Sequence, residues 1–332
     1  MKESPSKPYK IQYYNKVKAK AVKWLWYPYI PYGKITIIQG DPGDGKSTLA
    51  LNLLALVTNG GILPLSNKKI EQGTVIYQNN EDGKEDTIVP RMKACGADLS
   101  KVAYIDETED MLSMGDERIE QVLDETKARL IILDPIQAYL GDTDMNRASE
   151  IRPVFRRLAA IAQKRNCAVV LIGHMSKGGG KGLYRGLGSI DIAAVARSVL
   201  LVSKVREDLR VIAPIKNNLA PMGDSILFRI DGNSKINWIK TCKITAEQVM
   251  VGDVDDVDFS SNKILQAINI ISFCIKNGNC RARDIQAECQ RQGISARTIN
   301  TAKSKMNIKS LKTPNGWVWQ LYSEEETGND GE

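Results

Sequence analysis

The chain has 332 residues, a formal net charge of +7 and 42% hydrophobic residues, which suits a globular protein with one large and one small domain. Six scattered cysteines without a CxxC pair, together with a single histidine, exclude a zinc finger and indicate free thiols in a reducing, cytoplasmic compartment. No apolar run approaches the roughly 18 residues of a membrane span, so we expect no membrane partner.

From residue 34 onward, apolar strand-like runs alternate with helical stretches. This alternation predicts an α/β fold with a mostly parallel sheet covered on both faces. The predicted strands are Ile35–Gln39, Thr74–Gln78, Val102–Ile105, Leu130–Asp134 and Ala168–Gly173. The predicted helices are Lys46–Thr58, about Asp116 to Thr126, and Ala148–Arg165. Three later β-rich runs should extend the sheet, some of them antiparallel: Ser198–Val202, Arg210–Pro214 and Ser225–Ile230.

The composition changes near residue 245, which predicts a second, smaller domain. Three helices are expected there, followed by a strand in a hairpin: Lys263–Lys276, Arg281–Gln292, Ala296–Met306 and Gly316–Leu321. Two helices joined by a glycine-containing turn, with a trailing hairpin, form a winged helix-turn-helix. We therefore predict an N-terminal arm (1–33), a large domain (34–244), an acidic linker (245–261), a winged-helix domain (262–322) and a disordered acidic tail (323–332).

The predicted arm is basic and aromatic. Its tryptophans and tyrosines cluster just ahead of the first strand: Trp24, Trp26, Tyr27, Tyr29 and Tyr32. Such side chains in a basic context can stack on bases. Packing against the sheet, or against the next subunit, is the interpretation that we favour.

A complete P-loop motif follows the first predicted strand and opens the first predicted helix. Its residues are Gly40, Asp41, Pro42, Gly43, Asp44, Gly45, Lys46 and Ser47, with Thr48 next in the helix. Glycines at these positions let backbone N–H groups approach phosphates, and the helix N-terminus adds the positive end of its dipole. We expect Lys46 to contact the β- and γ-phosphates of ATP and Ser47 to ligate Mg²⁺.

Polar residues at three further strand ends complete the predicted site. Asp134 ends a wholly apolar strand and is the expected second Mg²⁺ ligand. Glu81 follows another strand and is the candidate for activating water, with Asp82 as its competitor. His174 follows a third apolar strand, where it could sense the γ-phosphate or fill a structural role.

Together these motifs resemble those of the RecA-like hexameric ATPases, specifically the RepA-type replicative DNA helicases of plasmids and phages. The resemblance covers roughly residues 20 to 240 and rests on five stretches: Gly33-Lys34-Ile35-Thr36, Glu81-Asp82, Leu133-Asp134-Pro135, Gly173-His174-Met175-Ser176-Lys177, and Gly188-Ser189 followed by Arg197. It implies a RecA-like P-loop fold and a homo-oligomer, expected to be a hexamer, with ATP at the subunit interfaces.

The resemblance also implies residue roles. Glu81 looks like the catalytic glutamate, His174 like the sensor, and Arg197 like an arginine finger supplied by the neighbouring subunit. Related ring helicases carry Lys-Asn-Arg where this chain has Lys216-Asn217-Asn218. Lys216 could still reach the γ-phosphate, but the missing arginine leaves Arg197 as the better finger candidate.

Two segments are candidates for contacting DNA. A glycine-rich basic loop after His174 is expected to bind single-stranded DNA through Lys177, Lys181, Tyr184 and Arg185. The third helix of the small domain offers Arg297, Asn300 and Lys303, side chains that contact bases and phosphates. The small domain could instead dock another protein. The two tryptophans of Trp317-Val318-Trp319 are expected to pack in its core rather than stack on bases.

The sequence thus predicts an ATP- and Mg²⁺-dependent, DNA-binding ATPase, with a replicative helicase of a mobile element as the leading hypothesis. A recombination or repair mediator, or a helicase loader without processive unwinding, is the first alternative. A DNA-binding initiator or regulator whose assembly is controlled by ATP is the second.

Overall fold

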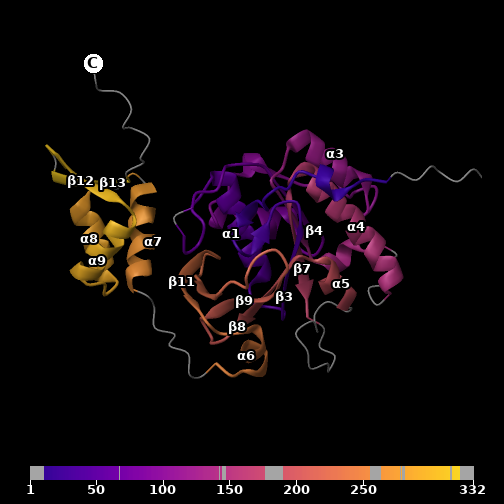
Figure 1. Ribbon diagram of the computed structural model, residues 1–332. Coiled ribbons are helices and arrows are strands. Elements are labelled where there is room, and N and C mark those ends of the chain that lie inside the picture. Colours follow the sequence, from indigo (N-terminus) through magenta and orange to yellow (C-terminus); the bar gives the residue numbers. More distant parts are fainter. Residues whose placement is uncertain are drawn as a thin grey trace, which may run out of the picture.

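The computed structural model describes residues 11–66, 68–141, 143, 147–175, 190–254, 263–276, 278, 281–314 and 316–321. Within these ranges a mixed sheet in the order β11-β10-β9-β8-β3-β7-β6-β4-β5 forms the centre of the large domain (Figure 1). Its strands are β3 (Ile35–Gly40), β4 (Val75–Asn79), β5 (Val102–Ala103), β6 (Leu130–Asp134), β7 (Ala168–His174), β8 (Ser198–Lys204), β9 (Arg210–Asn217), β10 (Ser225–Ile230) and β11 (Ile236–Cys242).

The strands from β5 to β8 in this order pair in parallel, whereas β8, β9, β10 and β11 pair antiparallel. The central strands β3, β6 and β7 are mostly apolar and buried along almost their whole length because helices cover both faces. The helices of this domain are α1 (Lys46–Asn59), α2 (Val89–Ala94), α3 (Glu117–Thr126), α4 (Ala148–Arg165), α5 (Ile190–Val195) and α6 (Ala246–Val251). Short 3-10 or π turns lie at Tyr14–Lys16, Lys84–Ile88, Leu99–Lys101 and Ile136–Tyr139.

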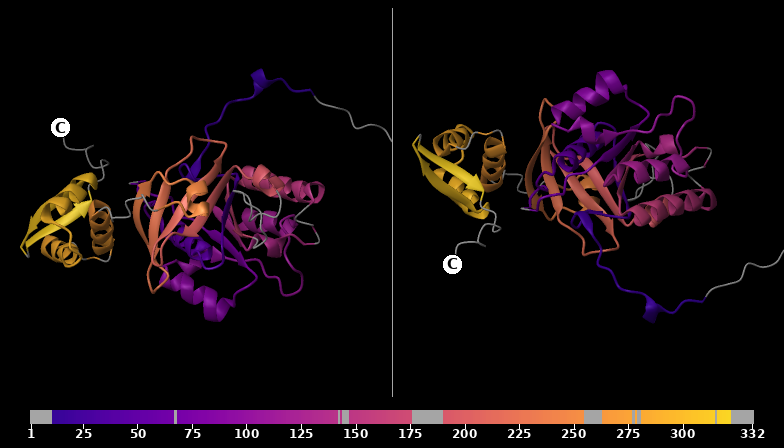
Figure 2. Two further views of the ribbon diagram at one scale, coloured as in Figure 1. Left: turned by 90° about the horizontal axis from the view of Figure 1, so that it is seen from below. Right: turned by 90° about the horizontal axis from the view of Figure 1, so that it is seen from above.

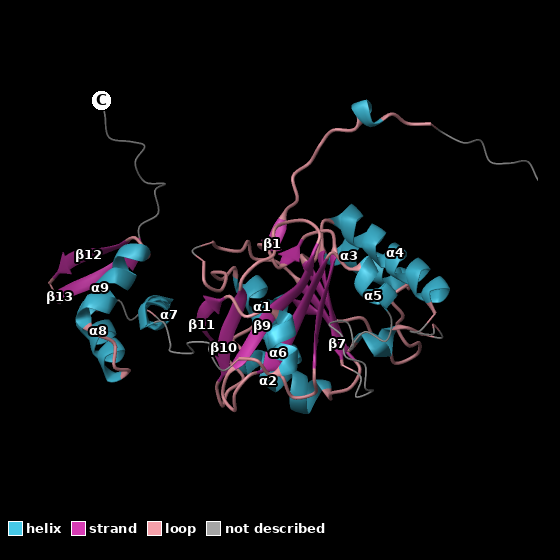
Figure 3. Cartoon of the chain, turned by 60° about the horizontal axis from the view of Figure 1, so that its bottom comes forward, coloured by secondary structure: helices cyan, strands magenta, loops and turns pink. Residues whose placement is uncertain are grey.

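Helices lie on either side of the sheet (Figure 3), and each face of the sheet has its own hydrophobic core. In β6, Ile131 and Leu133 join the core under α3, α4 and α5, while Leu130 and Ile132 join the core under α1 and α2. This alternation follows from the two-residue period of a strand. The α/β fold with a largely parallel sheet, predicted from the apolar runs, is confirmed.

Strand β11 and the helices α2, α5 and α6 were not predicted from the sequence. Isolated helices of six residues carry little local signal because tertiary packing, rather than propensity, stabilises them. The predicted linker of residues 245–261 is corrected at its start, where the chain forms helix α6 of the large domain. Thr245 and Gln248 form a capping box there, and Ala246 and Val249 are buried in the core.

The predicted arm of residues 1–33 is corrected at its C-terminal end. Strands β1 (Trp24–Trp26) and β2 (Ile30–Pro31) form an antiparallel pair on the body of the domain. Trp26 is buried against Trp238 of β11, with ring centroids 5.7 Å apart, and the Tyr29 hydroxyl donates to the carbonyl of Asp224 at 2.7 Å. These two aromatic side chains therefore pack on their own sheet. Residues 11–23 extend away from the body (Figure 2, indigo).

The C-terminal unit has a hydrophobic core of its own. The unit contains the helices α7 (Lys263–Lys276), α8 (Ala282–Arg291) and α9 (Ala296–Lys305) and the hairpin of β12 (Ile308–Thr313) with β13 (Gly316–Leu321). An isolated bridge pairs Arg281 with Val318 of β13. Helix α7 rests beside β11, where the Asn269 side chain donates to the carbonyl of Trp238 at 3.1 Å. The tail that was predicted for residues 323–332 lies outside the described residues.

Among the described helices, none combines the length and apolarity needed to cross a bilayer.

Candidate nucleotide site

The P-loop connects β3 to α1 at the carboxyl edge of the parallel strands. Gly45 lies before the first residue of α1 with φ of 95°, and Gly43 has φ of 84°, values that favour glycine. At Gly40 an added Cβ would lie 2.1 Å from the carbonyl oxygen of Val202 on β8. These glycines therefore meet two different requirements, a left-handed backbone and close contact with the next strand.

Asp44 fastens this loop to the neighbouring strands. Its carboxylate accepts hydrogen bonds from the backbone N–H groups of Asp41 at 3.0 Å and Lys204 at 3.2 Å. The Nε of Arg210 donates to the Asp44 carbonyl at 3.1 Å. Burial raises the pKa of the Asp44 carboxyl group above its ordinary value, while the hydrogen bonds from the backbone of Asp41 and Lys204 lower it. The sequence marked Asp44 as part of the loop but gave no signal for these long-range partners.

Lys46 lies inside the loop with only 3% of its surface exposed. Its ammonium group donates to the carbonyl of Asp41 at 2.8 Å. Burial lowers the pKa of Lys46, whereas the carboxylates of Asp44 and Asp134 raise it. A cation held in this way can stabilise phosphate oxygens.

Asp134 ends β6 next to the P-loop helix and is 1% exposed. One carboxylate oxygen accepts a hydrogen bond from the Tyr77 hydroxyl at 2.9 Å, and the side chain of Ser47 supplies another hydrogen bond. Burial raises the pKa of Asp134. The hydroxyl of Ser47 and this carboxylate form an oxygen donor pair of the kind that Mg²⁺ prefers, so the residues present fit the ion.

Tyr77 is a site residue that sequence reasoning missed. It lies on β4, two pairs before the Asn79–Asp134 pair in the parallel ladder with β6, on the same face of the strand as Asn79. A buried tyrosine in an apolar strand resembles ordinary core until the neighbouring strand is known.

Glu81 and His174 meet at the same sheet edge. The Nε2 of His174 lies 3.5 Å from a carboxylate oxygen of Glu81, whose side chain is 58% exposed. His174 pairs with Gly40 in the ladder between β3 and β7. Asp82, the competing candidate, forms a 3.0 Å ion pair with Arg91 instead. The geometry therefore favours Glu81 as the carboxylate that faces the site.

Arg197 and Lys216 lie at the other end of the sheet. Arg197 precedes Ser198, which pairs with Thr36 near the start of β3. Gly40 is four residues further along β3, about 13 Å at the rise of a strand. The structure therefore separates Arg197 from the P-loop of the same chain.

The ammonium group of Lys216 is engaged at the C-terminal end of α5. It donates to the carbonyls of Ala193 at 2.7 Å, Ala194 at 3.1 Å and Ala196 at 2.8 Å. Burial, and then the charge of Arg197, lowers the pKa of Lys216. A cation in this position stabilises the end of a helix.

The predicted DNA contacts are only partly visible. Lys177, Lys181, Tyr184 and Arg185 lie outside the described residues. Arg297 and Asn300 are exposed on α9.

Lys303 is the third predicted contact on α9. It donates to the Ser310 hydroxyl at 2.6 Å, and its ammonium group lies 5.3 Å from the ring centroid of Trp319. Part of its hydrogen-bonding capacity is thus used within the domain.

A P-loop at the carboxyl edge of a largely parallel sheet, with an acidic strand end beside it, defines a RecA-like P-loop ATPase. The family described as "AAA domain" matches residues 6–180 of the sequence, more than half of the chain. The chain belongs to this family.

Relatives among known proteins are distant. The chain is 25% identical over 202 residues to the DNA repair protein RadA of Aquifex aeolicus, covering 60% of this chain and 40% of the relative. It is 29% identical over 152 residues to the RadA protein of Listeria monocytogenes, covering 44% and 29%. For the RadA protein of Streptococcus pyogenes the identity is 23% over 224 residues, covering 66% and 44%. The chain thus spans less than half the length of these relatives.

Proposed function

We propose that the protein is a DNA-dependent ATPase of recombination or repair that works as a homo-oligomer with ATP bound between subunits. One observation carries the proposal. The P-loop, Asp134, Glu81 and His174 gather at one edge of the sheet, while the exposed Arg197 lies at the opposite edge. A head-to-tail assembly would bring these two edges together. The similarity to DNA repair proteins RadA supports DNA as the partner.

In this proposal, the residues of one chain bind the triphosphate and prepare the water. Lys46 and the backbone N–H groups of the P-loop hold the phosphates, and Ser47 with Asp134 would hold Mg²⁺. The ion, when bound, neutralises charge on the phosphate oxygens. Glu81 orients the attacking water, and its contact with His174 lets the state of the phosphate alter the position of the carboxylate.

The neighbouring chain supplies Arg197, whose guanidinium stabilises charge on the transferred phosphoryl group. For Lys216 we propose a positioning role instead of contact with the γ-phosphate. Its three hydrogen bonds fix the end of α5 directly ahead of Arg197.

For the C-terminal unit we propose a winged-helix domain. Three helices, a hairpin and the bridge at Arg281 follow the chain order of that motif. In this proposal Arg297 and Asn300, which are exposed on α9, would contact DNA. Lys177, Lys181, Tyr184 and Arg185 lie outside the described residues and stay predicted contacts. A protein-docking role for this domain remains the alternative hypothesis.

A replicative helicase, working as a hexamer, is the second candidate. The contact between Glu81 and His174 favours an enzyme that hydrolyses ATP repeatedly, because a binding switch needs no carboxylate to activate water. The motifs shared with RepA-type helicases support the same candidate.

The first experiment measures ATP hydrolysis with and without single-stranded DNA for the wild type, Lys46→Ala, Glu81→Gln and Arg197→Ala. We expect DNA to stimulate the wild type, and we expect each variant to lose most of its turnover. Mixing Glu81→Gln with Arg197→Ala should restore part of the activity, because mixed interfaces would contain both intact residues. No stimulation by DNA, or no recovery on mixing in an assembled state, would contradict the proposal.

The second experiment compares substrates. A repair or recombination ATPase should extend or migrate a three-stranded DNA junction, whereas a replicative helicase should displace a strand from a forked duplex. Lys46→Ala is the control in both assays. Strand displacement without junction activity would favour the second candidate.

A further inference from the structure

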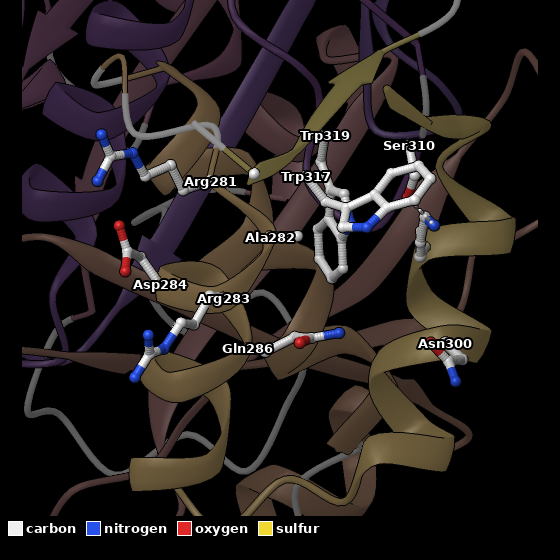
Figure 4. A pocket seen from close by; sticks show the side chains of 11 residues that line it. Arg281, Ala282, Arg283, Asp284, Gln286, Asn300, Ser310, Trp317 and Trp319 are labelled. Atoms are coloured by element: carbon white, nitrogen blue, oxygen red, sulfur yellow. Dashed lines mark hydrogen bonds between the residues drawn. The ribbon is translucent and has the colours of Figure 1, made fainter. Parts of the chain in front are cut away.

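The C-terminal unit contains an open groove of about 870 Å³ between the start of α8, the side of α9 and the hairpin β12–β13 (Figure 4). Cationic, amide and aromatic side chains line it, chiefly Arg281, Arg283, Gln286, Asn300, Lys303 and Trp317. This combination differs from the nucleotide site, where the ligand-facing groups are carboxylates and a P-loop.

The two tryptophans of β13 have different environments. They are two residues apart and so lie on the same face of the hairpin. Trp319 is 2% exposed and belongs to the core of the domain, as the sequence analysis expected. Trp317 is 55% exposed and lines the groove, so the expectation that it packs in the core is wrong. Trp317 presents a large aromatic surface to whatever enters the groove.

The groove lies in a strongly basic part of the chain. Residues 281 to 321 contain eight lysine and arginine residues and two carboxylates. One of these carboxylates, Glu288, is paired with Arg291, and the other, Asp284, lines the groove. Within the part of the chain that the structure describes, Arg281 and Arg283 form no ion pair, and both line the groove as exposed cations. An anionic ligand is therefore favoured.

We propose that this groove binds single-stranded nucleic acid, with Trp317 stacking on an unpaired base and Arg281 and Arg283 contacting phosphates. Aromatic side chains next to cations are the features that bind single strands without sequence preference. Gln286 of α8 and Asn300 of α9 also line the groove, below Trp317 in Figure 4, and their amide groups can hydrogen-bond to base edges.

The shape of the site favours a single strand over a duplex. A duplex hides the faces of its bases, and reading it requires a convex element that enters a groove of the DNA. Trp317 lines the groove with 55% of its surface exposed, so an unpaired base can stack on its ring, whereas the bases of a duplex already stack on one another. The groove in the C-terminal unit would give the proposed DNA-dependent ATPase a nucleic-acid site made of other residues than its ATP site.

The test uses the full chain without nucleotide and a thymidine-rich single strand that contains 5-iodouracil. Ultraviolet cross-linking followed by peptide mapping should place a cross-link on Trp317. Binding of the same strand, followed by fluorescence anisotropy, should weaken roughly tenfold in Trp317→Ala and recover in Trp317→Phe, which retains an aromatic ring. Arg283→Ala should also weaken binding and reduce its dependence on salt concentration.

Lys276→Ala is the matched control. Lys276 is exposed at the end of α7 and does not line the groove, so its loss should leave the cross-link on Trp317 in place. Circular dichroism checks that each variant folds. Three results would overturn the proposal: cross-links confined to other segments, equal cross-linking yield from a duplex, or competition by polyglutamate at the same charge concentration. ATP hydrolysis without DNA should be unchanged in Trp317→Ala, so failure here is distinguishable from failure of the proposed ATPase.

Discussion

Removing the hydroxyl group of Tyr77 tests whether this tyrosine supports the buried carboxylate of Asp134. The hydroxyl donates to Asp134 at 2.9 Å, and both side chains are almost fully buried, at 4% and 1% exposure. In Tyr77→Phe the ring still fills its place in the core, but the carboxylate loses one of its two side-chain donors. The change therefore isolates one hydrogen bond to a charged group.

The expected cost follows from that bond. Hydrogen bonds to charged groups contribute about 1.5–3 kcal/mol, so the free energy of unfolding should fall by roughly that amount. Water cannot replace the lost donor easily, because the surrounding strands are closed to solvent. Loss of this donor should also raise the pKa of Asp134 further, which weakens Mg²⁺-dependent nucleotide binding more at low pH than at neutral pH.

The assay is urea unfolding followed by circular dichroism, because the large domain supplies most of the regular structure. Tyr104→Phe is the matched control, since Tyr104 is 54% exposed and should lose less than about 0.5 kcal/mol. If Tyr77→Phe were as stable as Tyr104→Phe, the hydrogen bond would not support Asp134, and the argument would be refuted.

Three further predictions follow from the same geometry. Asp44→Asn should weaken ATP binding at least about tenfold, since the amide can accept only one of the two backbone hydrogen bonds that the carboxylate accepts. Asp41→Asn, at an exposed side chain, should bind ATP normally. Fluorescence of a labelled ATP analogue measures both affinities, and equal affinities would contradict the prediction. Asp134→Asn should change the pH dependence of stability. Because the pKa of Asp134 is raised in the folded state, its contribution to stability is greatest at low pH and is lost as pH rises from 3.8 through the folded-state value. Thermal unfolding across pH should show the wild type losing stability relative to the variant over that window, and parallel curves would exclude the effect. Lys216→Met should cost about 1–2 kcal/mol, because three carbonyls at the end of α5 lose a cationic donor; full stability with lost ATP hydrolysis would instead indicate direct contact with the phosphate.

The local sequence by itself determined most strands of the central sheet, the P-loop and the position of Asp134. Apolar runs such as Leu130–Asp134 are long enough to identify a buried strand, and a glycine-rich loop between strand and helix has few other structural explanations. The proximity of Glu81 and His174 was also predictable, since the ends of parallel strands meet at one edge of the sheet, while their roles in hydrolysis stay predictions.

Contacts between elements that are distant in the sequence could be identified only from the tertiary structure. The order of strands in the sheet placed Tyr77 beside Asp134 and brought Lys204 to Asp44, although each pair is far apart in the chain. Strand order and register depend on the packing of the whole domain, so a local pattern carries no record of them.

The sequence alone could not distinguish the two tryptophans of β13, because both lie on the same face of the strand. Helix packing covers Trp319 and leaves Trp317 exposed beside the groove. Folding likewise placed Lys216 at the end of α5 and Arg197 at the opposite edge of the sheet from the P-loop. The residue types predicted a phosphate-binding loop with an acidic strand end beside it, while the direction of each strand decided that Arg197 lies far from that loop in the same chain.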